Sequence, residues 1–221
     1  MKKYAIIVAG GLGLRMGTAR PKQFLLVHGK TLLSYTVEAF LKTYSDIQII
    51  IVLPSGYEAE GNGMIRDIKS AMPIQWITGG ATRFHSVKNG LTLVHEKSVV
   101  FVHDAVRCLV TGELIMRCFE SAVKNGSAVP CIDSKDSLRI VDAAGNRPVK
   151  RHEIKLLQTP QTFLSEVILS SYQKDYSEDF TDCASVVEKS NYQICLLEGE
   201  INNIKITTPL DLLIAEKLLT S

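Results

Sequence analysis

The chain has 221 residues, 46% of them hydrophobic, and its 25 Lys and Arg against 23 Asp and Glu leave a formal net charge of +2. This composition is compatible with one large domain or two small ones. The charged residues do not gather into a tail, and the net charge argues neither for nor against nucleic-acid binding. Five scattered cysteines without CxxC spacing predict reduced thiols rather than a metal site or a disulfide framework. No apolar run has membrane-spanning length and the N-terminal one is too short for a signal peptide, so we expect a soluble, cytoplasmic protein.

Strand-like and helix-like segments alternate along the first part of the chain. Apolar runs predict strands at residues 4–9, 48–54, 74–78, 98–104 and 128–132. Apolar residues at helical spacing predict helices at residues 32–41, 57–71, 84–94 and 113–125. This order predicts an α/β fold: a single-domain, open, mostly parallel Rossmann-like sheet with helices on both faces and with ligands beyond the carboxyl ends of the strands.

Residues 136–159 break this rhythm and alternate like a hairpin, with a turn predicted at Ala144, Gly145 and Asn146. We predict a protruding β-hairpin arm at about residues 136–155 of one domain spanning residues 1–221. An isolated two-stranded ribbon is marginal in water, so the arm would pack on a second copy in a homodimer. The chain then returns to helices at residues 165–174, 182–190 and 209–219 and a strand near 194–197, with Thr208 and Pro209 suited to a helix start.

The glycine-rich stretch VAGGLGLRMG, at residues 8–17, follows the first predicted strand. It does not fit the dinucleotide pattern G-x-G-x-x-G, because counting from Gly11 places Met16 at the third glycine, and the second predicted strand lacks the expected acid. It does not fit a P-loop either, because Thr18 follows Gly17. On this segment alone, a turn with a purely structural role stays open.

Two cations close to this loop favour a chemical role. Arg15 lies inside the loop and Lys22 follows in PKQF. Glycines allow backbone N–H groups to approach phosphate oxygens, and two added cations suit phosphates that gain charge during a reaction. We therefore predict a nucleoside triphosphate whose pyrophosphate leaves.

Asp104 ends the buried-strand pattern FVHD, where an unpaired carboxylate would be costly. It lies at a predicted carboxyl strand end and suits Mg²⁺ as a hard oxygen ligand. Pairing with Arg107, or capping of the next helix, is an equally good explanation from the local sequence. We predict that His103 is a structural imidazole rather than a base, because a phosphate nucleophile needs no deprotonation near neutral pH.

Several motifs occur together in a fixed order. They are the glycine loop, PKQF, GG-x-x-R-x-x-S-V at residues 79–87, HDAVR, TPQTF at 159–163, TD-x-AS at 181–185 and NIKITTP at 203–209. The ordered set resembles the 2-C-methyl-D-erythritol 4-phosphate cytidylyltransferase family, which serves the methylerythritol phosphate route to isoprenoids. The resemblance runs from residue 4 to about residue 215.

The resemblance implies that CMP is transferred from CTP to 2-C-methyl-D-erythritol 4-phosphate, with release of pyrophosphate and with Mg²⁺ as cofactor. It gives catalytic roles to Arg15 and Lys22, which would stabilise developing charge, and to Arg151 and Lys205, which would position the substrate phosphate. The implied nucleotide-binding residues are Ala9, Gly10, Gly11, Gly13, Gly80, Ala81 and Ser86. The implied substrate-binding residues are Asp104, which would also hold the metal, Arg107, Ser137, Thr159 and Thr181.

The resemblance also implies partners: CTP, a polyol phosphate and a second copy of the chain, with neither nucleic acid nor a membrane. The arm would complete the neighbour's active site, with Arg151 reaching the substrate phosphate from the other subunit. Three positions depart from the family pattern. Ser137 stands where threonine is more frequent, Cys108 replaces a proline after HDAVR, and Cys183 replaces an acid in TD-x-AS.

Plainer roles compete for several of these residues. Lys205 and Arg151 could be solvated charges, Ser86 could be helix filler, and Thr181 with Asp182 could be a helix N-cap. Residue types alone favour these plainer roles, and the shared order of motifs reverses that preference.

Three other functions compete with the whole assignment. Ribitol-5-phosphate cytidylyltransferase shares most of the motifs, but TDCAS followed by VVE favours the methylerythritol enzyme. An NAD(P)-dependent oxidoreductase is disfavoured by the glycine spacing. A non-catalytic nucleotide sensor would not need four cations, the two of the loop region together with Arg151 and Lys205.

Overall fold

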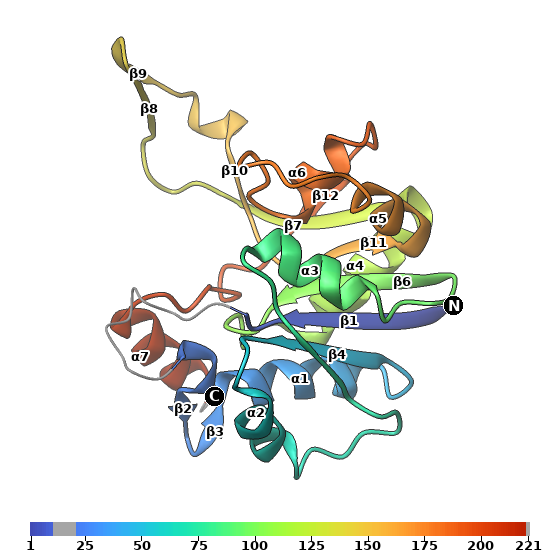
Figure 1. Ribbon diagram of the computed structural model, residues 1–221. Helices are drawn as coiled ribbons and strands as arrows, with labels where there is room; N and C mark the ends of the chain where they lie inside the picture. Colours follow the sequence, from blue (N-terminus) through green and yellow to red (C-terminus); the bar gives the residue numbers. More distant parts are fainter. Residues whose placement is uncertain (11–20, 220–221) are drawn as a thin grey trace.

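The structure is a computed structural model that describes residues 1–10 and 21–219. A central sheet is covered by helices on both faces, and a thin hairpin stands away from this body (Figure 1). The sheet strands are β1 (Lys2–Val8), β4 (Gln48–Leu53), β5 (Gln75–Thr78), β6 (Ser98–Asp104), β7 (Ser127–Asp133), β10 (Lys155–Leu157), β11 (Gln161–Leu164) and β12 (Leu196–Glu198). The helices are α1 (Leu32–Thr43), α2 (Glu58–Ile65), α3 (Arg83–Leu91), α4 (Gly112–Asn125), α5 (Ser165–Ser171), α6 (Cys183–Glu188) and α7 (Pro209–Leu218), with 3₁₀ turns η2 (Lys22–Phe24) and η3 (Arg151–Glu153).

The sheet has the order β10-β7-β11-β6-β1-β4-β5, and β12 also pairs with β7. Strand β1 pairs in parallel with β4 and β6, β4 with β5, and β12 with β7. Strand β11 lies antiparallel between β6 and β7, and β10 precedes it along β7. The mostly parallel α/β fold is therefore confirmed, with an inserted antiparallel strand that the sequence pattern did not predict.

Alternation along each central strand divides the core into two layers. Ala5 and Ile7 of β1 face the cluster that contains α1 and α4 residues. Tyr4 and Ile6 face the cluster that contains residues of α3, α5 and α6. Because both faces are covered, the strands are apolar throughout, which is why they are readable as continuous hydrophobic runs.

Helix ends differ from the predicted ends more than strand ends do. Helix α2 ends at Ile65 rather than near residue 71, and its own sequence contains Gly61 and Gly63, which lower helix propensity. Helices α5 and α6 end at Ser171 and Glu188, before the predicted residues 174 and 190. At α7 the predicted start is confirmed, because Thr208 caps the helix and Pro209 occupies its first turn. Within the described residues, no helix combines the length and the apolar character that crossing a membrane requires.

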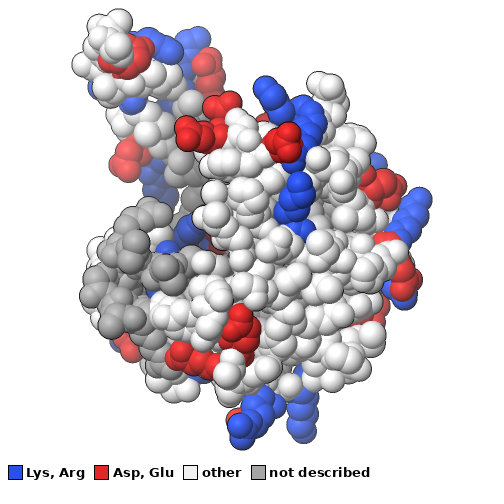
Figure 2. All heavy atoms as spheres, viewed as in Figure 1, with Lys and Arg blue, Asp and Glu red and all other residues white. Residues whose placement is uncertain are grey.

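The predicted arm is present as a two-stranded ribbon of β8 (Arg139–Asp142) and β9 (Gly145–Pro148). Asp142 pairs with Gly145, so the turn consists of Ala143 and Ala144 and lies one residue before the predicted one. All eight strand residues are exposed, and Val141 keeps 77% of its surface. The ribbon projects from the body and carries side chains of both charges (Figure 2). A small second ribbon, β2 (Leu26–Val27) with β3 (Lys30–Thr31), lies near α7.

Candidate active site

A cavity of about 840 Å³ opens where β1, β4 and β6 end. The register pairs Val8 with Asp104 and with Val52, so these three parallel strands end together. The described residues that line the cavity are Val8, Ala9, Gly10, Lys22, Gln23, Pro54, Ser55, Gly79, Gly80, Ala81, Thr82, Arg83, Ser86, Asp104, Ala105, Val106 and Lys205. This is the position predicted for a ligand of an open parallel sheet.

Ser86 organises the glycine segments on one side of this cavity. Its hydroxyl oxygen accepts a hydrogen bond from Gly80 N at 3.1 Å. A Cβ atom at Gly10 would lie 3.0 Å from that oxygen, and one at Gly79 would lie 2.9 Å from it. Glycines at these positions therefore let two loops approach the same buried hydroxyl. This contact argues against the plainer role, in which Ser86 would be a helix residue without a specific contact.

The PKQF segment is tied to the ends of two other segments. Gln23 is buried, and its Nε2 donates to the carbonyl oxygen of Ala9 at 2.6 Å. Lys22 Nζ donates to the carbonyl oxygen of Ile206 at 3.2 Å. The first strand, PKQF and NIKITTP thus meet at the cavity. Gly11, Gly13 and Arg15 lie outside the described residues.

Asp104 is the centre of a charged cluster at the end of β6. Lys205 Nζ lies 2.8 Å from Oδ2, and Arg83 Nη2 lies 3.4 Å from Oδ1. Arg107 Nε lies farther away, 3.9 Å from Oδ2. Burial by itself would raise the pKa of the Asp104 carboxyl, but the nearby cations, Arg83 first, hold that pKa well below its usual value. Asp104 is therefore a carboxylate at neutral pH, and its pairing with Arg107, which the sequence left open as an alternative role, is present as the longest of three ion pairs.

The described cavity lining contains one carboxylate, a type of ligand that Mg²⁺ prefers. Asp104 is the single carboxylate in the described lining, and no group of three His, Cys, Asp or Glu residues gathers in the described part of the chain. Mg²⁺ often uses one or two carboxylates together with substrate phosphates and water. This donor set fits an ion bound largely through a triphosphate, with Asp104 as the protein ligand.

His103 and Thr159 support Asp104 from inside the fold. His103 Nε2 lies 3.1 Å from the carbonyl oxygen of Arg107, so this nitrogen carries the proton. Nδ1 then accepts from the Thr159 hydroxyl at 3.0 Å, and the same hydroxyl oxygen accepts from Asp104 N at 3.1 Å. Burial lowers the pKa of His103 to about 4. His103 is buried and both of its ring nitrogens have partners, as a structural imidazole requires, and Thr159 lies behind Asp104 rather than in the cavity lining.

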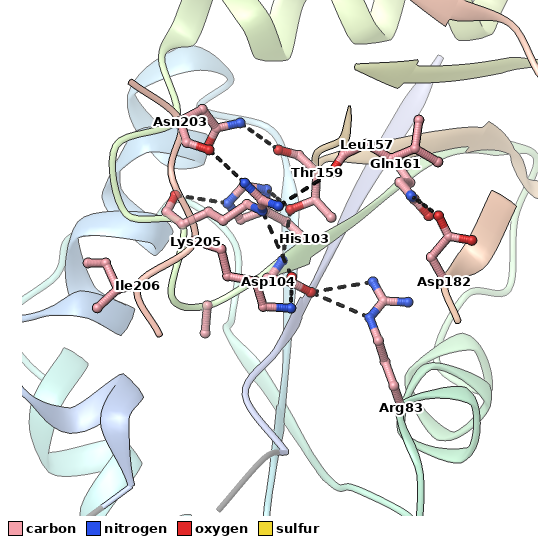
Figure 3. Close-up of polar contacts among 12 residues, drawn as sticks. Arg83, His103, Asp104, Leu157, Thr159, Gln161, Asp182, Asn203, Lys205 and Ile206 are labelled. Atoms are coloured by element: carbon pink, nitrogen blue, oxygen red, sulfur yellow. Dashed lines mark hydrogen bonds and ion pairs between the residues drawn. The ribbon is translucent and has the colours of Figure 1, made fainter. Parts of the chain in front are cut away.

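Arg107 connects three segments through backbone oxygens. Its Nη1 donates to Asn203 O at 2.6 Å and its Nη2 to Leu157 O at 3.4 Å. Asn203 Nδ2 donates in turn to Thr159 O at 2.8 Å. These contacts hold HDAVR, TPQTF and NIKITTP together behind the cavity (Figure 3).

The TPQTF and TD-x-AS motifs meet through one buried side chain. Gln161 Nε2 donates to Asp182 Oδ2 at 2.7 Å, and its Oε1 accepts from the backbone N–H of Cys183 and Ala184 at 2.9 and 3.1 Å. Asp182 also caps α6 in a capping box with Ser185. The N-cap role for this motif is confirmed, whereas Thr181 is exposed and does not line the cavity.

Two predicted residues lie on or near the arm. Ser137 is exposed between β7 and β8, and Arg151 is exposed in η3, where its Nη1 donates to Lys135 O at 3.0 Å. Neither lines the cavity of its own chain.

The described fold therefore divides the predicted site residues into two groups. It brings to the cavity lining Ala9, Gly10, Lys22, Gly80, Ala81, Ser86, Asp104 and Lys205. It leaves outside that lining Arg107, Ser137, Arg151, Thr159 and Thr181. Gln23, Arg83 and Gln161 were given no role from the sequence, although each lies within a recognised motif.

Comparisons with a family model, with related sequences and with solved structures all indicate the same family. Residues 4–221 match the family model of 2-C-methyl-D-erythritol 4-phosphate cytidylyltransferase. Relatives of that name include those of Bacteroides thetaiotaomicron, 47% identical, and Phocaeicola vulgatus, 45% identical, each aligned over 99% of this chain and 100% of the relative.

Solved structures agree with this result. The crystal structure of 2-C-methyl-D-erythritol 4-phosphate cytidylyltransferase from Thermus thermophilus matches with a TM-score of 0.79 and 31% identity over 100% of both chains. That of 4-diphosphocytidyl-2C-methyl-D-erythritol synthase from Anaerococcus prevotii matches with a TM-score of 0.84 and 26% identity, over 100% of this chain and 99% of the other. With its strand-end cavity and its ordered motifs, the chain belongs to the 2-C-methyl-D-erythritol 4-phosphate cytidylyltransferase family.

Proposed function

We propose that this protein transfers CMP from CTP to 2-C-methyl-D-erythritol 4-phosphate, giving 4-CDP-2-C-methyl-D-erythritol and pyrophosphate for isoprenoid precursor synthesis. The observation that carries the proposal is the convergence of the glycine segments, Lys22, Asp104 and Lys205 on one cavity. The names of the full-length relatives support this choice of substrates.

The nucleotide would occupy the side of the cavity built around Ser86. Gly10, Gly80 and Ala81 offer little side-chain bulk there, so a base and its phosphates can approach the backbone closely. Lys22 would lie near the phosphates together with Arg15. A base-binding site of this kind selects nucleotides by the size of the base and by the hydrogen-bonding groups on its edge, which favours one nucleotide over another.

The acceptor would occupy the side that contains Asp104 and Lys205. An oxygen of its phosphate attacks the α-phosphorus of CTP, a new P–O bond forms, and the bond to the β-phosphate oxygen breaks. Lys205 and Arg151 would position the attacking phosphate, and Asp104 would accept a hydrogen bond from an acceptor hydroxyl. Lys22 and Arg15 would stabilise charge on the leaving pyrophosphate. No covalent intermediate is required, because positioning and electrostatic stabilisation suffice.

A divalent cation completes the proposed chemistry. Mg²⁺ would neutralise phosphate charge when it is bound, with Asp104 as its protein ligand. Asp104 is the single carboxylate of the described lining, which supports this role, and we propose that the protein works in the cytoplasm.

We also propose a homodimer formed through the arm. The ribbon is exposed on all eight strand residues, and apolar side chains such as Val141 and Ile140 remain accessible. Arg151 does not line the cavity of its own chain, which supports a role in the neighbour's site. A two-fold dimer would give each cavity one arm from the other chain.

Pyrophosphate release tests the activity directly. The purified chain is supplied with CTP and either 2-C-methyl-D-erythritol 4-phosphate or ribitol 5-phosphate, and NAD(P)H absorbance is followed as a control. We expect release with the methylerythritol substrate, much less with ribitol 5-phosphate, and no change in NAD(P)H. Equal or greater release with ribitol 5-phosphate would reverse the choice of substrate.

A further inference from the structure

Arg83 begins α3 and belongs to the GG-x-x-R-x-x-S-V motif, but the proposed reaction assigns it no role. Its Nε and Nη2 each lie 3.4 Å from Asp104 Oδ1. Its Nη1 donates to the Sγ atom of Cys183 at 3.3 Å. Figure 3 shows Arg83 and Lys205 reaching Asp104 from opposite sides. The guanidinium therefore joins the end of β6 to the start of α6.

Cys183, the second partner of Arg83, is buried and uncharged. Cys183 has no exposed surface, and the Tyr172 hydroxyl donates to its sulfur at 3.2 Å. Burial raises the pKa of the Cys183 thiol above its usual value, so the sulfur is a neutral acceptor. Asp104 is thus the carboxylate that balances the charge of Arg83. The planar guanidinium, with one edge on Asp104 and Nη1 on Cys183, has little freedom to turn.

The two cations that flank Asp104 differ in exposure. The Lys205 side chain is 41% exposed, whereas the Arg83 side chain is 24% exposed and attached at two points. In the proposed reaction, Lys205 binds the acceptor phosphate, which draws its ammonium away from Asp104 Oδ2. Arg107 cannot take over the close contact that Lys205 makes with Asp104. Its Nε lies 3.9 Å from Asp104 Oδ2, and its terminal nitrogens bind backbone oxygens. Arg83 is then the contact that keeps the carboxylate in place.

We propose that Arg83 is a positioning residue that holds Asp104 Oδ1, so that Oδ2 is presented to the acceptor once Lys205 has moved to the acceptor phosphate. This inference rests on the proposed function. It predicts that loss of Arg83 impairs use of the polyol phosphate more than use of CTP, since the residue acts through Asp104.

The first test separates the two substrates kinetically. In Arg83→Met we expect the KM for 2-C-methyl-D-erythritol 4-phosphate to rise about tenfold, the size of a lost pairwise contact, while the KM for CTP changes less than about twofold. Arg83→Lys restores a cation without the fork and should recover part of this loss. The matched control is Phe84→Leu, the next residue of α3, whose ring stacks on Tyr172 with centroids 4.9 Å apart. It should lower stability and leave both KM values near those of the wild type.

The second test asks whether Arg83 acts through Asp104. Binding of the polyol phosphate is measured by calorimetry on protein loaded with α,β-methylene-CTP, in the wild type, Arg83→Met, Asp104→Asn and the double variant. We expect Arg83→Met to weaken binding about tenfold in the wild-type background and less than about twofold beside Asp104→Asn. This non-additivity is a result that a merely structural residue would not produce.

Each alternative result has a definite meaning. Equal losses in both backgrounds, or a profile like that of Phe84→Leu, would overturn the role of Arg83 and leave the proposed function intact. If Arg83→Met does not fold, Arg83→Gln, which also lacks the cation, carries the same comparison, and wild-type acceptor affinity in that variant would overturn the inference. A wild-type chain that releases no pyrophosphate with CTP and either polyol phosphate would overturn the proposed function and this inference together.

Discussion

Lys205 Nζ lies 2.8 Å from Asp104 Oδ2, which joins the segment before α7 to the carboxyl end of β6. Both residues line the same cavity, so the ion pair occupies space that a substrate would use. The Lys205 side chain is 41% exposed, so its ammonium can reach another anion, whereas Asp104 is buried and keeps Arg83 as a second partner. In the proposed reaction, Lys205 would bind the acceptor phosphate and Asp104 would accept a hydrogen bond from an acceptor hydroxyl, so the ion pair would open when the acceptor binds.

Asp104→Asn should nearly abolish pyrophosphate release. The amide is an uncharged and poorer ligand for Mg²⁺, and it also leaves Arg83 and Lys205 without their carboxylate. Activity of the wild type should disappear with EDTA and return with Mg²⁺. Asp175→Asn, which changes an exposed aspartate, serves as the control and should leave pyrophosphate release unchanged. Full activity of Asp104→Asn at ordinary Mg²⁺ would contradict the assignment.

Lys22→Ala and Arg15→Ala should lower kcat much more than they weaken CTP binding. Interactions with charge that develops in the transition state affect rate before affinity, and one such donor is worth on the order of 10²–10³ in rate. Single-turnover rates and CTP titrations measure the two effects separately. Lys30→Ala, which removes a surface pair with Glu38, is the control. Near-normal turnover combined with weak CTP binding would contradict the stabilising role.

The protein should prefer CTP to UTP, ATP and GTP. In the proposed binding mode, a site that hydrogen-bonds the cytosine amino group leaves an acceptor unpaired when uracil enters, and a slot bordered by Gly80, Ala81 and Ser86 would also select by base size. Specificity constants for the four nucleotides, measured with one acceptor, give the comparison. Similar specificity constants for CTP and UTP would rule out recognition of the cytosine amino group.

Gln161→Leu should lower the free energy of unfolding by about 1–3 kcal/mol, because two buried N–H groups at the start of α6 lose their acceptor. Asp182 also loses a donor. Chemical denaturation of the wild type and the variant measures the change. Gln173→Leu replaces an exposed glutamine and should cost much less. A loss no larger than that of the control would show that these contacts contribute little.

Two inactive chains should restore activity when mixed. If Arg151 reaches the neighbour's site, a dimer of one Arg151→Ala chain and one Lys22→Ala chain contains one site with both wild-type residues. Random exchange at equal amounts makes half the dimers mixed and half of their sites intact, so activity should recover to roughly a quarter of wild type. Exchange is verified with differently tagged chains. No recovery despite exchange would mean that Arg151 does not act in the partner's site.

The strands that hold the site were predictable because their pattern is local. Residues 48–54 and 98–104 form continuous apolar runs, and strands buried on both faces need that composition wherever they lie in the sheet. The position of Asp104 at a strand end followed from the same runs. The arm was also visible, since alternation over residues 136–159 differs from the pattern of the buried strands.

The placement of β11 could not be predicted in this way. Gln161–Leu164 is short, and its antiparallel insertion between β6 and β7 depends on pairing partners that are distant in sequence. The contacts of Arg83 have the same origin. Its partners, Asp104 and Cys183, come from β6 and α6, so their meeting depends on how α3 and α6 pack on the sheet.

The sequence by itself determined the fold class, the strand ends that bear the site, and the set of motifs that indicates the family. These features depend on residue types and spacing within short segments. The tertiary structure decided which motif residues reach the cavity and which, like Thr159 and Gln161, support it from behind. That choice depends on side-chain directions and on packing between segments far apart in the chain, because a hydrogen bond requires two groups to meet within a few ångströms.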